Sequence, residues 1–288
     1  MSWPGPELTR LLRAADRALD DGPRRPVADG PLRVGVDLGT ACVVVFVVDA
    51  AGDPVAGAYR WAGVVRDGVV VDYAGTVALV RELRAEVEER VGRELTTAAV
   101  TIPPDVPMSD VRAHRYAVEA AGLECSALVE EPVAANAVLR LRDGVIVDVG
   151  GGTTGIAVVR GGTVVMTADE PTGGTHLSLV IAGAHRIPYE EAELLKRDPA
   201  RHQELLPVVR PVLEKIATIV ARHLVGHDAR AIYLVGGTSA FTGIAAVIEE
   251  ITGISTLVPG NPLFVTPLGV AYHDGSPALV GTGTEGVP

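Results

Sequence analysis

Apolar residues occur along the chain in two alternating patterns. Short apolar runs bounded by glycine and proline begin at Arg33 and recur at 98–102, 123–129 and 231–241, which is typical of buried strands. Between them lie stretches with apolar residues every three or four positions, which predict helices. These helical stretches cover 75–92, 132–141, 176–197 and 203–225. Strands that alternate with helices predict an α/β protein.

One strand–turn–strand unit occurs twice. VGVDLGT opens a unit over residues 34–59, and IVDVGGGTTGIAVV opens a similar unit over residues 146–165. Each unit has an aspartate after an apolar strand, then a glycine turn, a threonine and a second strand. This repeat predicts two related domains with a ligand-binding cleft between them. We place the first domain at 32–142, the second at 143–268, a return to the first at 269–275 and a flexible tail at 276–288.

An amphipathic helix is predicted over residues 7–20, with leucines on one face and charges on the other. Gly22 and Pro23 end this helix, and a proline-rich linker follows. We therefore treat residues 1–31 as an N-terminal helix with its linker. The helix can pack on the core of the protein or dock onto another protein, and the sequence leaves both alternatives open.

Three consecutive glycines, Gly150, Gly151 and Gly152, interrupt the second unit. Glycine weakens a strand because it has no side chain to pack, so the close approach of another group would explain them. Successive backbone amides at such a turn can bind an anion, and phosphate is the common example. Nearby hydroxyls at Thr40, Thr153 and Thr154 would add hydrogen-bond donors.

Asp37 and Asp148 would lie beside a phosphate bound at these turns, which is unfavourable unless a cation separates the charges. Mg²⁺ suits this position because it bridges carboxylates to phosphate oxygens and keeps most of its water. A third glycine turn, LVGGTS at 234–239, is placed to contact a nucleoside. A single glycine turn is more simply a tight corner. Three such turns, two with a matching Asp and Thr, favour a nucleotide site, although the motif GxxxxGK[ST] is absent.

Five motifs follow one another in a fixed order. They are DLGT (37–40), EEPVAA (130–135), DVGGGTT (148–154), LVGGTS (234–239) and TPLGVA (266–271). This set resembles the actin-like ATPase superfamily, which includes DnaK-type chaperones and MreB-type filament proteins. The resemblance implies a duplicated, ribonuclease H-like two-domain fold with an interdomain nucleotide cleft. Within the superfamily, VVRDGVVVDYAG and PVLEKIATIVARH are similar to the EutJ family of ethanolamine utilisation.

The resemblance implies roles for individual residues at the matching positions. Asp37 and Asp148 match the two catalytic aspartates that hold hydrated Mg²⁺ beside ATP. Glu131 matches the catalytic acidic residue that orients the attacking water. Phosphate-binding turns match Gly39, Thr40, Gly150, Gly151, Gly152 and Thr153. Nucleoside contacts match Gly236 and Gly237, together with Glu214 and Lys215.

The chain also departs from the pattern of that superfamily. DnaK-type chaperones use a lysine of their first domain for hydrolysis. Here the two lysines, Lys196 and Lys215, both lie in the second half. Ser178 stands where those chaperones have the aspartate of a GGxxxD motif. ATP hydrolysis is therefore expected to be slow or absent.

The resemblance implies a chaperone-like or assembly factor of ethanolamine utilisation, driven by Mg–ATP binding and slow hydrolysis of ATP to ADP and phosphate. Its partners would be nucleotide and a protein client among the ethanolamine-utilisation enzymes or the shell of a bacterial microcompartment. Two alternatives stay open: a polymerising MreB-like structural protein and a small-molecule kinase. The short insert after Gly174 disfavours a filament, and the lack of substrate loops disfavours a kinase.

Composition excludes some classes of partner. The net charge of −11 and the lack of a basic stripe argue against nucleic-acid binding. No apolar run is long enough to cross a bilayer, and no signal-peptide pattern opens the sequence. Cys42 and Cys125 give no disulfide framework, which favours a reducing compartment. We therefore expect a cytoplasmic protein, and the resemblance adds an association with a microcompartment.

Two further features have simple explanations. Cys42 follows the first glycine turn and is either a reactive thiol or, more simply, a small apolar residue that fills a corner. His223 and His227 are spaced one helical turn apart, but neighbouring Gly226 and Asp228 indicate a helix end. A solvated helix end therefore explains these histidines better than a zinc site.

Overall fold

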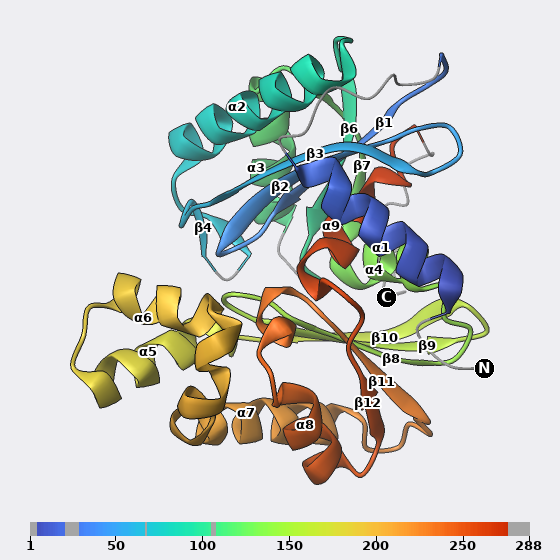
Figure 1. The fold of residues 1–288 in the computed structure, drawn as a ribbon. Coiled ribbons are helices and arrows are strands. Elements are labelled where there is room, and N and C mark those ends of the chain that lie inside the picture. Colours follow the sequence, from blue (N-terminus) through green and yellow to red (C-terminus); the bar gives the residue numbers. More distant parts are fainter. Residues whose placement is uncertain (1–4, 21–28, 67, 105–107, 276–288) are drawn as a thin grey trace, which may run out of the picture.

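The structure, a computed structural model, describes residues 5–20, 29–66, 68–104 and 108–275. Two five-stranded sheets form the upper and lower halves of the molecule in Figure 1. A small hairpin of β4 (Val65–Arg66) and β5 (Val69–Val70) projects from the upper half. The predicted linker over 21–28 and the tail over 276–288 lie outside the described residues.

The first sheet has the strand order β3-β2-β1-β6-β7. Its strands are β1 (Arg33–Leu38), β2 (Cys42–Val48), β3 (Pro54–Trp61), β6 (Thr97–Ile102) and β7 (Glu124–Glu130). β1, β2 and β3 form an antiparallel meander, whereas β6 and β7 continue the sheet in parallel. Parallel neighbours need crossover connections, and the helices α2 (Tyr73–Val91) and α3 (Met108–Ala120) supply them.

The second sheet repeats this arrangement with the order β10-β9-β8-β11-β12. Its strands are β8 (Gly144–Val149), β9 (Thr154–Arg160), β10 (Thr163–Glu170), β11 (Ala231–Val235) and β12 (Ser255–Leu257). Three α-helices, α5 (Gly174–His185), α6 (Tyr189–Arg197) and α7 (His202–His223), lie between β10 and β11, and α8 (Ile244–Thr252) lies between β11 and β12. The predicted duplication of an α/β unit is therefore confirmed.

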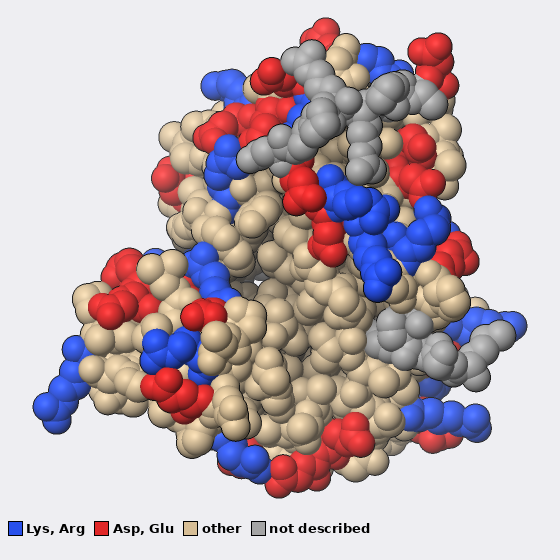
Figure 2. Space-filling view, viewed as in Figure 1, with Lys and Arg blue, Asp and Glu red and all other residues tan. Residues whose placement is uncertain are grey.

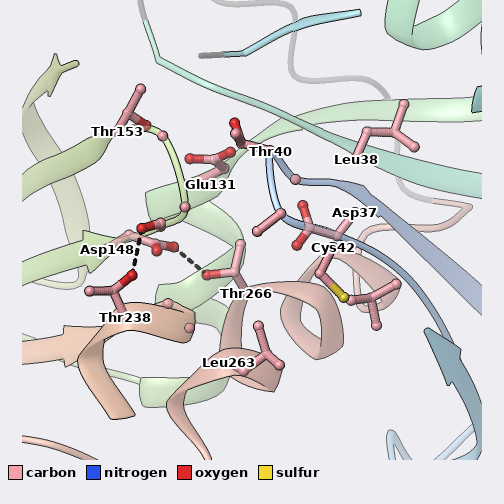
Figure 3. A pocket seen from close by; sticks show the side chains of 18 of the residues that line it. Asp37, Leu38, Thr40, Cys42, Glu131, Asp148, Thr153, Thr238, Leu263 and Thr266 are labelled. Atoms are coloured by element: carbon pink, nitrogen blue, oxygen red, sulfur yellow. Dashed lines mark hydrogen bonds between the residues drawn. The ribbon is translucent and has the colours of Figure 1, made fainter. Parts of the chain in front are cut away.

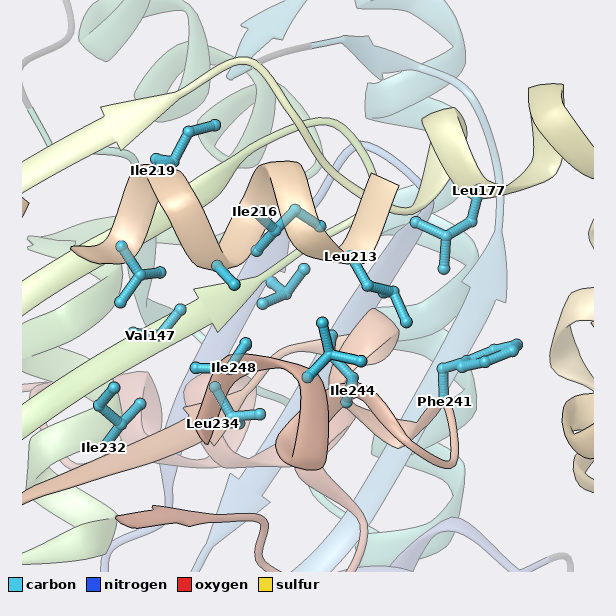
Figure 4. Close-up of a cluster of buried hydrophobic side chains, with 14 of the residues drawn as sticks. Val147, Leu177, Leu213, Ile216, Ile219, Ile232, Leu234, Phe241, Ile244 and Ile248 are labelled. Atoms are coloured by element: carbon cyan, nitrogen blue, oxygen red, sulfur yellow. The ribbon is translucent and has the colours of Figure 1, made fainter. Parts of the chain in front are cut away.

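Each half has an apolar core of its own. In the second half, Leu213 and Ile216 on α7 pack with Leu234 on β11 and Ile244 on α8, all of them fully or almost fully buried (Figure 4). A similar cluster fills the first half beneath α2 and α3. A third cluster joins the halves and includes buried residues of α1, β2, β8 and β9. Buried apolar surface therefore holds the two halves together as well as stabilising each one.

The N-terminal helix α1 (Pro6–Leu19) packs on the core of the protein, which was one of the two predicted alternatives. It lies across β3 in Figure 1. Its apolar stripe of Leu8, Leu11, Leu12 and Ala15 is buried in the cluster that joins the halves. Burial of this stripe leaves the charged face of α1 toward solvent.

Two short helices that pack against each other connect the halves: α4 (Glu131–Leu139) leads from the first sheet to the second, and α9 (Val265–Ala271) returns to the first half. The two helices meet where a Cβ on Gly269 would overlap the carbonyl oxygen of Ala134. On β1, a Cβ on Gly35 would lie 2.5 Å from the amide nitrogen of Ala271. Only glycine permits these close backbone approaches.

One predicted helix is wrong in its extent. The helical pattern over 176–197 is divided into α5 and α6, because Arg186 adopts a left-handed conformation with φ of 56°. Pro188 follows two residues later and disfavours helical geometry at residue 187. The break turns α6 back toward the first half, which matters for the site described below. The helix predicted over 132–141 also ends early, at Leu139, because Arg140 is left-handed.

Candidate functional site

The two predicted acidic turns occupy equivalent places in the two sheets. Asp37 is the next-to-last residue of β1, and Asp148 is the next-to-last residue of β8. Each strand turns back into its antiparallel neighbour directly afterwards. The turns also touch each other, because a Cβ on Gly151 would lie 2.8 Å from the Cβ of Ala41. The halves therefore come into contact at these turns, where glycine leaves the backbone uncovered.

Both turns line one cavity between the halves, and the space-filling view shows the surface hollowed there (Figure 2). Its empty space is about 940 Å³, counting the part that opens to solvent. The predicted residues that line it are Asp37, Gly39, Thr40, Glu131, Asp148, Gly150, Gly151, Gly152, Thr153, Gly236 and Gly237.

Asp148 is buried and Asp37 is partly buried, and a threonine from another element holds each of them. Thr101 on β6 donates its hydroxyl to Asp37 at 2.6 Å. Thr266 on α9 donates to Asp148 at 2.8 Å (Figure 3). Burial raises the pKa of Asp37 to about 7 and the pKa of Asp148 to about 6, although both hydrogen bonds act in the opposite direction. A compensating positive charge would therefore favour the ionised form of both carboxyls near neutral pH.

Glu131 opens α4 and projects between the two turns. Figure 3 shows its carboxyl between the turn that carries Thr40 and the loop that carries Thr153. Burial raises its pKa well above the usual value, and the charges of Asp148, Asp37 and Asp169 add to this rise. Repulsion among these carboxylates makes the cavity a place where a divalent cation would be strongly stabilised.

The third glycine turn packs closely against the second. Gly236 has φ of 85°, and a Cβ there would overlap the Oδ1 atom of Asp148. Thr238 donates its hydroxyl to the carbonyl oxygen of Gly150 at 2.8 Å. Glycine at position 236 is therefore required twice, by the backbone conformation and by the lack of space. Gly237 follows at the start of a short 3₁₀ turn, η2 (Gly237–Ala240).

The cavity fits Mg²⁺ bound mainly through water and phosphate. Among the described residues, no group of three His, Cys, Asp or Glu side chains could form a metal centre by itself. Mg²⁺ in nucleotide sites usually takes only one or two protein carboxylates and keeps several waters. Asp37 and Asp148 are available for that purpose, and their raised pKa values would fall once a cation compensated their charges.

Two predicted site residues are not brought to the cavity. Glu214 accepts a hydrogen bond from Nε of Arg210 at 2.7 Å, and Lys215 is exposed. Both lie on α7, where Leu213 and Ile216 point into the core. With 3.6 residues per turn, the positions between these two are directed away from the core. The expected nucleoside contacts therefore have no support from the positions of these two side chains.

Sequence reasoning missed three charged residues of α6 that line the cavity: Glu193, Lys196 and Arg197. Lys196 lies 2.6 Å from Glu193 in an ion pair. The guanidinium carbon of Arg197 lies 3.9 Å from the ring centre of Trp61, which belongs to the first half. The spacings of three and four residues between these side chains are visible in the sequence. The break between helices α5 and α6, which brings α6 over the cavity, is not visible there.

The two simpler explanations agree with the structure. Cys42 is buried, and burial raises the pKa of its thiol to about 12, so it is a small core residue and not a reactive thiolate. His223, in the last turn of α7, contacts Glu170 through Nε2 at 2.7 Å. Within the described ranges, no helix is both long and apolar enough to span a membrane.

The paired sheets, the crossing of α4 and α9 and the shared cavity define an actin-like ATPase fold. The family model for MreB/Mbl protein matches residues 60–192, and the model for cell division protein FtsA matches residues 145–277. The crystal structure of MreB5 of Spiroplasma citri bound to ADP has a TM-score of 0.69 to this structure. That similarity covers 88% of this chain and 98% of MreB5 at 18% identity, which shows a shared fold.

A narrower relationship follows from sequence identity. The chain is 46% identical over 265 residues to the ethanolamine utilization protein EutJ of Salmonella typhimurium, covering 92% of each chain. It is 49% identical to EutJ from Carboxydothermus hydrogenoformans, whose crystal structure has a TM-score of 0.87 and covers 92% of this chain and 97% of that one. The chain therefore belongs to the EutJ family of ethanolamine utilization proteins.

Proposed function

We propose that the cavity binds ATP with Mg²⁺ and that nucleotide binding drives an assembly or chaperone-like role in ethanolamine utilisation. One observation carries the nucleotide proposal: Asp37 and Asp148, at matched turns of the two sheets, line one cavity together with bare glycine backbone. Backbone amides at such turns bind phosphate without a charged side chain. The ADP bound to MreB5 is consistent with this fold accepting a nucleotide.

In this proposal each turn has a separate task. Asp37 and Asp148 would hold Mg²⁺, and the metal would supply charge stabilisation for the phosphates. The backbone around Gly39 and Thr40 and the loop from Gly150 to Thr153 bind phosphate oxygens. Gly236 and Gly237 leave room for the nucleoside. Because the ligands come from both halves, binding favours the closed arrangement of the cleft.

Glu131 is the candidate for orienting the attacking water during hydrolysis. Its raised pKa favours the protonated carboxyl while the charges of the aspartates beside it are uncompensated. Compensation of those aspartate charges removes much of the repulsion, lowers the pKa of Glu131 and leaves it able to accept a proton. Hydrolysis is therefore coupled to occupation of the metal site. We propose that hydrolysis is slow because both lysines of the chain lie in the second half, so the first half has no lysine to assist it.

Competition binding tests the nucleotide proposal. A fluorescent ATP analogue is bound with Mg²⁺ and displaced with ATP, ADP, GTP and AMP. We expect ATP and ADP to compete and AMP to compete weakly, because AMP lacks the phosphates that the two turns would hold. Failure of every purine nucleotide to compete contradicts the proposal. Phosphate release from ATP, measured in parallel, shows whether bound ATP is hydrolysed.

The cellular role rests on membership of the EutJ family. We propose a protein client among the enzymes of ethanolamine utilisation or the shell proteins of its microcompartment. Purified candidates from one organism are titrated against this protein in the presence of Mg–ATP or Mg–ADP. Affinity for one candidate that differs between the two nucleotides supports an assembly or chaperone-like role. Equal affinity in both nucleotide states for every candidate contradicts it.

A polymerising protein is the second candidate, favoured by the match of the MreB/Mbl model to residues 60–192. Actin-like folds can form filaments without a further domain, so the fold does not decide between the two. Sedimentation and light scattering with ATP, ADP and no nucleotide separate them. Nucleotide-dependent pelleting in the absence of any client favours the filament and contradicts our first proposal.

A further inference from the structure

A second hollow lies beside the N-terminal helix α1. Three arginines from distant parts of the sequence line it: Arg10 on α1, Arg33 at the start of β1 and Arg140 directly after α4. We call this hollow the arginine pocket. Among the described residues, none lines both this pocket and the cavity between the halves. Because the chain has a net charge of −11, the gathering of three cations in one hollow needs an explanation.

Arg33 is bound by backbone and by an aromatic ring. Its guanidinium donates to the carbonyl oxygens of Tyr272 and Asp49, both at 3.4 Å, and its central carbon lies 5.7 Å from the centre of the Tyr272 ring. Hydrogen bonds of 3.4 Å are long. Among the described residues, no carboxylate forms an ion pair with Arg33. Since a guanidinium has five N–H groups, Arg33 keeps donors for a negatively charged ligand.

Tyr272 forms one wall of the pocket and stays uncharged. Its hydroxyl donates to the carbonyl oxygen of Gly52 at 3.0 Å. Burial raises the pKa of this phenol to about 12. At neutral pH Tyr272 therefore adds no negative charge that would compensate Arg33.

The other two arginines form exposed ion pairs at the rim. Arg10 lies 2.9 Å from Asp53, and Arg140 lies 2.6 Å from Glu7. Between 43% and 69% of each of these four side chains is exposed. Ion pairs as exposed as these contribute little stability. A carboxylate of another molecule can therefore replace Asp53 or Glu7 at small cost.

Arg13 and Arg17 extend the positive charge along α1. Both are exposed, and they lie three and seven residues after Arg10, on the same side of the helix. Figure 2 shows basic side chains gathered over the region that α1 occupies in Figure 1. An extended acidic segment seated in the arginine pocket would therefore meet further positive charge along α1.

The chemistry of the pocket favours protein carboxylates over lipid or nucleic acid. The apolar stripe of α1 is buried in the core, so this helix has no apolar face to insert into a bilayer. Nucleic acid needs a broad positive surface, whereas this pocket also contains Glu7 and Asp53. The planar guanidinium group matches a carboxylate through two parallel hydrogen bonds.

We propose that the arginine pocket binds an acidic segment of a partner protein, with one glutamate or aspartate carboxylate bound to Arg33. Neighbouring carboxylates of the same segment bind Arg10 and Arg140 at the rim. The pocket lies outside the cavity between the halves, so this proposal does not depend on ATP binding.

A fluorescently labelled peptide of six glutamates, titrated against the full chain and followed by anisotropy, tests the proposal. We expect it to bind, and to bind more weakly as salt rises, whereas a labelled peptide of six glutamines should not bind. Arg33→Gln should weaken binding about tenfold, because hydrogen bonds between charged groups are lost. Arg201→Gln removes the same charge from an exposed position paired with Glu204, and it should leave the affinity unchanged.

Asp53→Asn tests the pocket without removing an arginine. It frees Arg10 from its ion pair and should strengthen binding of the glutamate peptide about threefold. Asp228→Asn removes the same negative charge from an exposed position elsewhere and should change the affinity little. This comparison decides the matter if thermal melting shows that Arg33→Gln does not fold.

Four results would overturn the proposal. The first is a glutamate peptide that binds no more tightly than the glutamine peptide. The second is an equal loss in Arg33→Gln and Arg201→Gln, which would mean general attraction between charges. The third is an equal affinity of Asp53→Asn and Asp228→Asn. The fourth is tighter binding to phosphatidylserine vesicles than to the glutamate peptide, which would mean that this surface meets a membrane.

Discussion

The two halves share a strand order and an acidic glycine turn, but they differ in what surrounds the turn. In the first half, the crossover connections of the sheet contain the two helices α2 and α3. The residues of this half that line the cavity include Asp37 and Glu131. The second half has three α-helices between β10 and β11, and one of them brings Lys196 and Arg197 to the cavity. The repeated sheet therefore places the two aspartates, while the added helices place the cations.

This difference suggests a division of labour between the halves. Each half contributes one aspartate, Asp37 or Asp148, that would serve the metal. The first half adds Glu131, and the second adds the longer glycine loop and the cations of α6. Neither half alone forms the site. Closure of the cleft would then depend on both halves, because each binds a different part of the same ligand. Substitutions at matched positions in the two halves test whether the division holds.

The largest effect is expected at the paired aspartates. Asp148→Asn should weaken Mg-dependent ATP binding about 1,000-fold, because the substitution removes a buried negative charge that would attract the cation. Asp37→Asn should cost less at pH 7, since the pKa of Asp37 is raised to about 7 and that of Asp148 to about 6, so Asp148 is the more fully ionised. Calorimetric titration measures both, with the exposed Asp228→Asn as control. Equal small losses at both positions would mean that neither aspartate serves the metal.

The next effect concerns the rate and not the affinity. Glu131→Gln should lower phosphate release from ATP about 100-fold, since the amide cannot accept the proton of the attacking water. ATP affinity should change by less than about threefold, because the proposal gives Glu131 no contact with the nucleotide. Single-turnover release of phosphate measures the rate. An unchanged rate removes Glu131 from the reaction.

The third effect tests the glycine loop of the second half through stability. Gly236→Ala should lower the free energy of unfolding by about 2 kcal/mol or more, through the strained φ of 85° and the overlap with Asp148. Gly161→Ala also places alanine at positive φ, but nothing lies within 4 Å of its Cβ, so it isolates the backbone cost of about 1 kcal/mol. Denaturant unfolding measures both. Equal losses of stability in the two variants would show that the close packing of Gly236 against Asp148 adds nothing to the backbone cost.

The smallest effect is a dependence on pH. Mg–ATP affinity should fall about tenfold from pH 8 to pH 6, because Asp37, with a pKa raised to about 7, must lose its proton for the cation to bind. The stability of the nucleotide-free protein should change with pH in the opposite direction. Its folded state binds more protons than the unfolded chain between pH 4 and pH 7, so its stability falls as pH rises through that window.

Titration calorimetry in buffers of different ionisation enthalpy measures the protons released when Mg–ATP binds. Release near pH 7 is expected from the unsubstituted protein and should diminish in Asp37→Asn. Affinity that is constant from pH 8 to pH 6, with no proton release, would contradict the assignment of Asp37 to the metal site.

Most of the backbone turns that form the site could be predicted from the sequence, because the sequence patterns that indicate them are local. The repeat around Asp37 and Asp148, the glycine runs and the start of α4 at Glu131 each depend on a few neighbouring residues. The duplicated fold followed from the same repeat. Local patterns of this kind survive folding because the backbone itself forms the turns.

The remaining parts depend on contacts between distant segments. Thr101 and Thr266 come from other elements to bind the two aspartates, and no spacing in the sequence links them. Lys196 reaches the cavity only because Arg186 and Pro188 divide a helix that the periodicity predicts to be continuous. Glu214 and Lys215 were assigned by resemblance alone, and neither is among the residues that line the cavity.

Calorimetric titration of ATP into the unsubstituted protein, with and without Mg²⁺, tests the central claim most directly. We predict saturable binding of one ATP per chain that depends on Mg²⁺ and disappears in Asp148→Asn. Absence of measurable affinity for ATP and ADP in the folded protein, or binding that is indifferent to both Mg²⁺ and Asp148, would contradict the account.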